Sequence, residues 1–194
     1  MNDNTSDEFD PLRALQPDRV HPDDPGDPAV VSRQKERLMS TIDQTNDDGS
    51  LGYRTPGIYP RLAYSDERAA LDYLVRVFGL TEIREARMEW GDHVLAWLRL
   101  GDGMVMIGHA NHDVHHIYSP QEVGHTTAMV NVYVHDVDAH YAHAVTEGAD
   151  VTMELEDAFY GQRVYEATDL EGHRWHFSEP FAAIRARGGT VPDE

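Results

Sequence analysis

The 194-residue chain carries 35 acidic and 16 basic residues and a formal net charge of −19. So acidic a protein is a poor partner for nucleic-acid phosphates or an anionic membrane surface, and we expect neither. The absence of cysteine excludes disulfides, thiolate catalysis and cysteine-ligated zinc. No run of residues reaches the roughly 18 apolar positions of a membrane span. The N-terminus also lacks an apolar signal core, so we expect a cytoplasmic protein.

Residues 1–57 differ in composition from the rest of the chain. The run DEFDPLRALQPDRVHPDDPGDPAVV is dense in aspartate and proline, a composition that buries too little surface to offset the entropy of ordering. We predict an acidic, partly disordered arm with a short helix over Ala29–Ile42, and Met39 is a candidate alternative start. The arm is either free or wrapped over a neighbouring subunit. A non-catalytic interaction module, in which this arm docks onto a partner, is therefore one candidate function.

A regular hydrophobic pattern begins at Ile58. We predict a strand over 59–64 and a helix over Asp66–Phe78, with Ser65 as its N-cap and Gly79 at its end. Three more strands are predicted over 81–90, 93–100 and 104–108. The order of these elements is β-α-β-β-β.

The same order returns about 70 residues later. A strand over 127–135 precedes a helix that Asp136 caps, then a strand over 151–155 and a hairpin over 162–178. The predicted fold class is α+β, with two tandem modules pairing into a curved, cup-like mixed sheet and helices outside. The predicted boundaries are a domain over 58–180, with modules over 58–109 and 127–178, and a short tail over 181–194 with a helical turn.

Three segments carry a resemblance to a known family: AYSDERAALDYLVRVFGL in the first module, and YVHDVDAHYAHAVTEGAD and YGQRVYEATDLEGHRWHF in the second. They resemble the glyoxalase, bleomycin-resistance and extradiol-dioxygenase superfamily, also called vicinal oxygen chelate proteins. The likeness covers residues 59–179. It implies the paired cup, a homodimer and a small-molecule ligand. The family spans metal-dependent isomerases, dioxygenases and thiol transferases as well as metal-free drug-binding proteins, so membership does not choose a function.

The resemblance also implies where a metal would be held. Metal-dependent members carry His or Glu on the opening strand and the last strand of each module. Those positions fall here at Tyr59, Met104–Ile107, Met129 and His176. A metal needs several converging nitrogen or oxygen ligands, and His176 alone is competent, so we expect no metal and no cofactor. The alternative is a metal-dependent lyase, isomerase or dioxygenase whose atypical ligand set includes His176 and a connector histidine.

Strand alternation predicts which side chains line the cup. The expected ligand-binding residues are Tyr59, Arg61, Trp97, Asn131, Tyr133, Arg163, Tyr165, Arg174 and His176. Guanidinium groups, aromatic rings and an imidazole suit a planar or anionic small molecule. Two alternatives remain: the arginines pair with acidic residues across the sheet, or the acidic surface favours a cationic ligand. His176 is the candidate catalytic base, or else a hydrogen-bond donor to the ligand.

Histidines are concentrated in the connector over 109–125. Those at positions 109, 112, 115 and 116 are spaced to hold a transition metal if the segment folds back on itself. Gly108, Asn111 and Asp113 favour a solvated loop instead. His140 and His143 lie on the second predicted helix, where we expect both side chains to be exposed.

Overall fold

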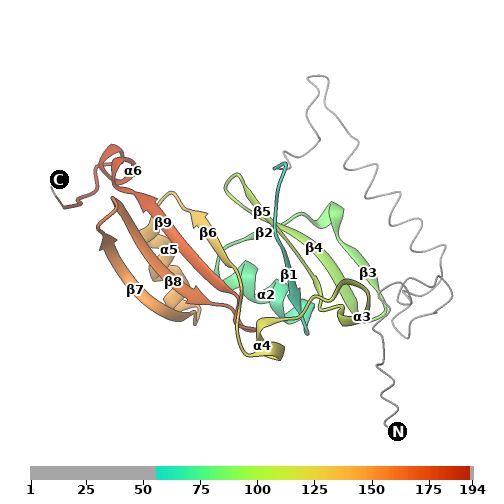
Figure 1. The fold of residues 1–194 in the computed structure, drawn as a ribbon. Helices are drawn as coiled ribbons and strands as arrows, with labels where there is room; N and C mark the ends of the chain where they lie inside the picture. Colours follow the sequence, from blue (N-terminus) through green and yellow to red (C-terminus); the bar gives the residue numbers. More distant parts are fainter. Residues whose placement is uncertain (1–55, 193–194) are drawn as a thin grey trace, which may run out of the picture.

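The computed structural model describes residues 56–192. The predicted arm and its helix over Ala29–Ile42 lie outside these residues. Two curved sheets, one of five strands and one of four, carry the fold, and each has a helix on one face (Figure 1). The predicted α+β architecture of two tandem modules is confirmed. Within 56–192, no helix has both the length and the apolar character needed to cross a membrane.

The first module contains seven elements. They are β1 (Arg61–Tyr64), α2 (Glu67–Val77), β2 (Thr81–Glu82), the 3-10 helix η2 (Arg84–Ala86), β3 (Met88–Trp90), β4 (His93–Leu100) and β5 (Gly103–His109). β5 pairs with β1 in parallel and with β4 in antiparallel register. The single strand predicted over 81–90 is wrong, because η2 interrupts it. There Ala86 turns inward and packs in a cluster with Trp97.

Helix α2 begins one residue later than the sequence suggested. The cap is Asp66, whose Oδ1 accepts a hydrogen bond from the Ala69 N–H at 2.9 Å. The Ser65 N–H instead donates to the Glu171 carboxylate of the second module. Ser65 therefore belongs to the junction between the modules.

The second module repeats the plan of the first. It consists of β6 (Met129–Tyr133), α5 (Val137–Thr146), β7 (Asp150–Ala158), β8 (Gln162–Thr168) and β9 (Arg174–Pro180). β6 pairs in parallel with β9, as β1 does with β5. Asp136 caps α5 as predicted, accepting from the Ala139 N–H at 3.0 Å. Two short helices, α3 (His112–His115) and α4 (Pro120–Val123), form the connector, and α6 (Phe181–Ala186) stands where a helical turn was predicted.

One hydrophobic core joins the modules. The helix-covered faces of both sheets contribute to it, and Phe78 at the end of α2 packs on Trp175 and Phe177 of β9, with ring centroids 5.4 and 5.1 Å apart. No strand of one sheet pairs with a strand of the other within the described residues. The face of each sheet opposite its helix, which we call the open face, therefore lies on the outside of this core. The two open faces of one chain do not face each other.

Buried polar groups reinforce this junction. Asp169 is buried, and its carboxylate accepts hydrogen bonds from the Tyr64 hydroxyl at 2.6 Å and from Trp175 Nε1 at 3.1 Å. The backbone N–H groups of Glu171 and His173 also donate to it. Burial together with the nearby Asp169 charge raises the pKa of Tyr64 well above its ordinary value, so its hydroxyl remains a donor.

Candidate functional site

The open face of the first module is apolar and aromatic. Trp97 of β4 is buried there with Ala86 and Met104, and Tyr59 and Leu95 are partly buried against this group. Tyr59 and Trp97 therefore lie on the open face, as the sequence suggested. This cluster contains no residue of the second module.

Arg61 lies beside that cluster. Its Nη2 donates to the backbone carbonyl of His109 at 3.2 Å, whereas its buried Nε has no hydrogen-bond partner among the described residues. A Cβ at Gly108 would lie 2.7 Å from Leu95 Cδ1 and 3.4 Å from Arg61 Nη2, so the glycine leaves room for both side chains. Burial lowers the pKa of the guanidinium, but arginine stays charged at any physiological pH. The result is a half-buried cation without a carboxylate partner in residues 56–192.

The open face of the second module is polar. Strand pairing places His176 between Asn131 of β6 and Glu166 of β8. His176 Nδ1 lies 3.3 Å from Glu166 Oε1, and Arg174 forms an ion pair with the other oxygen of the same carboxylate. Tyr133, also predicted for the site, is 67% exposed at the end of β6. Sequence reasoning missed Glu166, although the hairpin register opposes it to His176.

Arg163 and Tyr165 are on the wrong face for the predicted cup. The hairpin register pairs Tyr165 with Phe177, a core residue, so both rings point toward the helix and stack 5.0 Å apart. Tyr165 is fully buried, and burial raises the pKa of its hydroxyl far above the ordinary value. That hydroxyl lies 2.7 Å from His140 Nδ1. The predicted exposure of His140 is therefore also wrong, and burial lowers the pKa of its imidazole.

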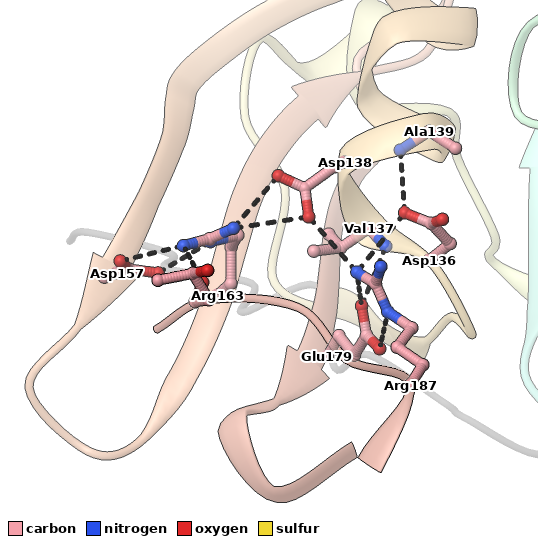
Figure 2. A network of polar contacts seen from close by, with 9 residues as sticks. Asp136, Val137, Asp138, Ala139, Asp157, Arg163, Glu179 and Arg187 are labelled. Carbon is pink, nitrogen blue, oxygen red and sulfur yellow. Dashed lines mark hydrogen bonds and ion pairs between the residues drawn. The ribbon is translucent and has the colours of Figure 1, made fainter. Parts of the chain in front are cut away.

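Arg163 belongs to a network of ion pairs on the helix-covered side (Figure 2). Its guanidinium contacts Asp157 at 2.7 Å and Asp138 at 3.1 Å. Next to it, Arg187 contacts the buried Glu179 at 2.8 Å and also reaches Asp138. For Arg163, and for Arg174 on the open face, the alternative of pairing with acidic residues is therefore correct.

We expect Arg187→Gln to lower the free energy of unfolding at neutral pH and to lower it much less at acidic pH. Burial alone would raise the pKa of the Glu179 carboxyl, but hydrogen bonds from Arg187 and the Val137 N–H, with the Arg187 charge, hold it below its ordinary value. The ionised Glu179 carboxylate stabilises the folded state fully above its ordinary pKa, near 4.5. This stabilisation is lost as the pH falls through the lower pKa that the carboxyl has in the folded state. The variant should be less stable at neutral pH, and the difference should shrink below about pH 4.5. Urea unfolding across this range, with Arg84→Gln as the exposed control, tests it; equal pH profiles would contradict it.

Two groups of three side chains are close enough together to hold a cation. Asp136, Asp138 and Glu179 form one group, but Arg187 already contacts all three carboxylates. The other group comprises Glu67, His93 and His109. In residues 56–192 neither group includes His176. In the connector, His112 contacts Glu122 at 2.8 Å and stacks on Tyr118, and the histidines of 109–116 do not converge on one point.

Known proteins share this fold and sequence pattern. The sequence model of the Glyoxalase/Bleomycin resistance protein/Dioxygenase superfamily matches residues 58–177. An uncharacterized protein of Mycobacterium bovis is 31% identical over 134 residues, which are 66% of this chain and 86% of that protein. The crystal structure of TioX from Micromonospora sp. ML1 is 35% identical and has a TM-score of 0.54, covering 64% of this chain and 99% of TioX. A superfamily member from Sphaerobacter thermophilus DSM 20745 is 18% identical and has a TM-score of 0.50, covering 64% of this chain and 98% of that chain.

Proposed function

Because the chain belongs to the Glyoxalase/Bleomycin resistance protein/Dioxygenase superfamily, we propose that it binds a planar, anionic small molecule in a cup built from the open faces. The observation that carries this proposal is Arg61. It is the half-buried guanidinium whose Nε has no hydrogen-bond partner in residues 56–192 and which lies beside an aromatic cluster. An aromatic ligand with an acidic group would pair with this guanidinium and cover the Trp97 cluster at once.

We propose further that a complete cup needs two copies of the chain. The open faces of one chain do not face each other, so the residues on them cannot converge on one ligand within that chain. A homodimer would place the first module of one copy against the second module of the other. Exposed aromatic and apolar side chains on the second module support such an interface: Met129, Tyr133, Phe159 and Tyr160.

The polar half of the cup supports binding without a metal. Glu166 holds His176 at 3.3 Å and pairs with Arg174, so its charge is already matched. Within the described residues, no third His, Asp or Glu joins these two in a group able to hold a cation. His176 is then placed to donate to or accept from the bound molecule. The metal-dependent alternative would require a third ligand near His176 from outside residues 56–192 or from a second copy.

Mixed dimers test both parts of the proposal. The probe is 8-anilinonaphthalene-1-sulfonate, an aromatic anion that fluoresces when bound. We expect dimers of Arg61→Met chains, and dimers of His176→Ala chains, to bind it weakly. Mixing the two variants in equal amounts should restore about a quarter of the native capacity, because about half of the dimers are then mixed and one of the two cups in each mixed dimer holds both native residues. If the cup is formed within one chain, mixing restores nothing, and if light scattering gives a monomer, the two-copy cup is wrong.

A further inference from the structure

Three side chains converge at one end of the first sheet. Glu67 lies in the first turn of α2, His93 begins β4 and His109 ends β5. Both imidazole Nδ1 atoms approach the same carboxylate oxygen, Glu67 Oε1, at 3.1 Å for His93 and 3.6 Å for His109. The two rings lie against each other, with centroids 4.0 Å apart.

Hydrogen bonds among these three side chains do not satisfy all of their buried polar atoms. The carboxylate is almost fully buried, with 4% of its side chain exposed. One imidazole can donate a proton to it, and His93 is at hydrogen-bond distance. His109 Nδ1 is too far away to do the same, and it is buried without a hydrogen-bond partner in the described part of the chain. A buried nitrogen of this kind costs free energy, so some further group is expected to satisfy it.

The spacing of the three atoms fits a metal ion. In a tetrahedral zinc site with bonds of about 2.0–2.1 Å, neighbouring ligand atoms lie about 3.3 Å apart. The distances from Glu67 Oε1 to the two nitrogens bracket this value, and all three ligand atoms lie within 4.8 Å of one another. A deprotonated carboxylate and two imidazoles also form a ligand set that zinc and related divalent transition metals prefer.

We propose that Glu67, His93 and His109 bind a divalent transition-metal ion, with Zn²⁺ as the best fit. The side chains of His93 and His109 are 22% and 25% exposed, which leaves a solvent-facing side for a fourth, water ligand. The ion would connect the start of α2 to the start of β4 and the end of β5, in a chain that has no cysteine for cross-links. It would stabilise the first module by binding the folded state only.

This site is distinct from the proposed cup. Glu67 belongs to the helix that covers the opposite face of the first sheet, and none of the three residues is in the Trp97 cluster. One contact connects the two places, because Arg61 donates to the backbone carbonyl of His109. Metal binding at this site and ligand binding in the cup are therefore separate proposals, and the failure of one does not contradict the other.

Untagged full-length chain, treated with a chelator and then dialysed against Zn²⁺, provides the test. We expect elemental analysis to find about one Zn²⁺ per chain, and the thermal midpoint to rise by several degrees when Zn²⁺ is restored. His93→Ala, His109→Ala and Glu67→Gln should each abolish both effects. His112→Ala and His115→Ala are matched controls in the adjacent, exposed connector and should leave both effects unchanged.

The native chain supplies a second readout that needs no variant to fold. In ¹⁵N spectra of the histidine side chains, Zn²⁺ should shift the Nδ1 resonances of His93 and His109 and spare those of the connector. The proposal is overturned if Zn²⁺ fails to bind at micromolar concentration. It is also overturned if the ion shifts only His112, His115 or His116, or if it stays bound after both His93 and His109 are replaced.

Discussion

Replacing Asp169 with alanine is expected to lower the free energy of unfolding by about 3–5 kcal/mol. The buried carboxylate accepts hydrogen bonds from the Tyr64 hydroxyl, from Trp175 Nε1 and from two backbone N–H groups. The substitution leaves all four donors buried without an acceptor, and each such donor costs on the order of 1–3 kcal/mol when unsatisfied. The expected loss of unfolding free energy is smaller than the sum of four such penalties, because the structure relaxes partly and water enters the space.

Urea unfolding followed by circular dichroism measures this effect. Asp72→Ala is the matched control, because Asp72 is an exposed aspartate of α2 with no interaction in the described structure. Its substitution should change the free energy of unfolding by less than about 0.5 kcal/mol. Because Asp169 lies in the core shared by both modules, we expect one cooperative transition at a lower urea concentration. A loss below about 1 kcal/mol for Asp169→Ala would show that the junction does not depend on this carboxylate.

Replacing Arg61 with methionine is expected to weaken binding of the aromatic sulfonate probe at least tenfold. A hydrogen bond to a charged group contributes about 1.5–3 kcal/mol, and about 1.4 kcal/mol corresponds to a factor of ten in affinity. The same substitution should reduce the free energy of unfolding by no more than about 1 kcal/mol, because Arg61 has no carboxylate partner within residues 56–192 and loses there only the hydrogen bond from its Nη2 to the His109 carbonyl. Much weaker binding with little loss of stability is the result expected of a binding residue, and it separates Arg61 from the ion-paired arginines.

Fluorescence titration and thermal unfolding of the same samples provide both readouts. Arg68→Met is the control, since Arg68 is an exposed arginine of α2 that pairs with Glu89. Arg61→Lys should bind with intermediate affinity, because an ammonium group keeps the charge but loses the flat, forked geometry. Native affinity in Arg61→Met would place the probe elsewhere and would remove the main support for an anionic ligand.

Much of the fold could be predicted because local signals agree with it. The bounds of β4 match the predicted strand, β8 begins where the predicted hairpin begins, and Asp136 caps its helix as its sequence context indicates. The repeat of the parallel β1–β5 and β6–β9 pairs follows from the internal duplication. Where a residue's structure is determined by its neighbours along the chain, the sequence is sufficient to predict it.

The errors arise where distant parts of the chain meet. Ser65 is not the cap, because the Asp66 carboxylate accepts from the Ala69 N–H, and Glu171, more than a hundred residues away, accepts from the backbone N–H groups of both Ser65 and Asp66. His140 is half-buried because Phe78 of the other module lies beside it. Tyr165 does not lie on the open face, because the hairpin register pairs it with Phe177 and both side chains pack in the core.

No sequence pattern indicates the proposed metal site. Glu67, His93 and His109 are separated by 26 and 16 positions, so no motif spacing connects them. They meet only because the start of α2, the start of β4 and the end of β5 lie together in the fold. The density of histidines in the connector made that segment a candidate metal site, but among them only His109 belongs to the group with Glu67 and His93 in the described residues.

The positions of the three tryptophans make the chain its own set of fluorescent reporters. Trp175 is buried in the core between the modules, Trp97 lies in the cluster beside Arg61, and the Trp90 ring is centred 6.0 Å from that of His93. Variants that keep one indole and carry phenylalanine at the other two positions would therefore emit from one region each. Separation of the modules, occupancy of the cup and binding of a quenching ion such as Cu²⁺ would then be recorded as three distinct optical signals from an unlabelled protein.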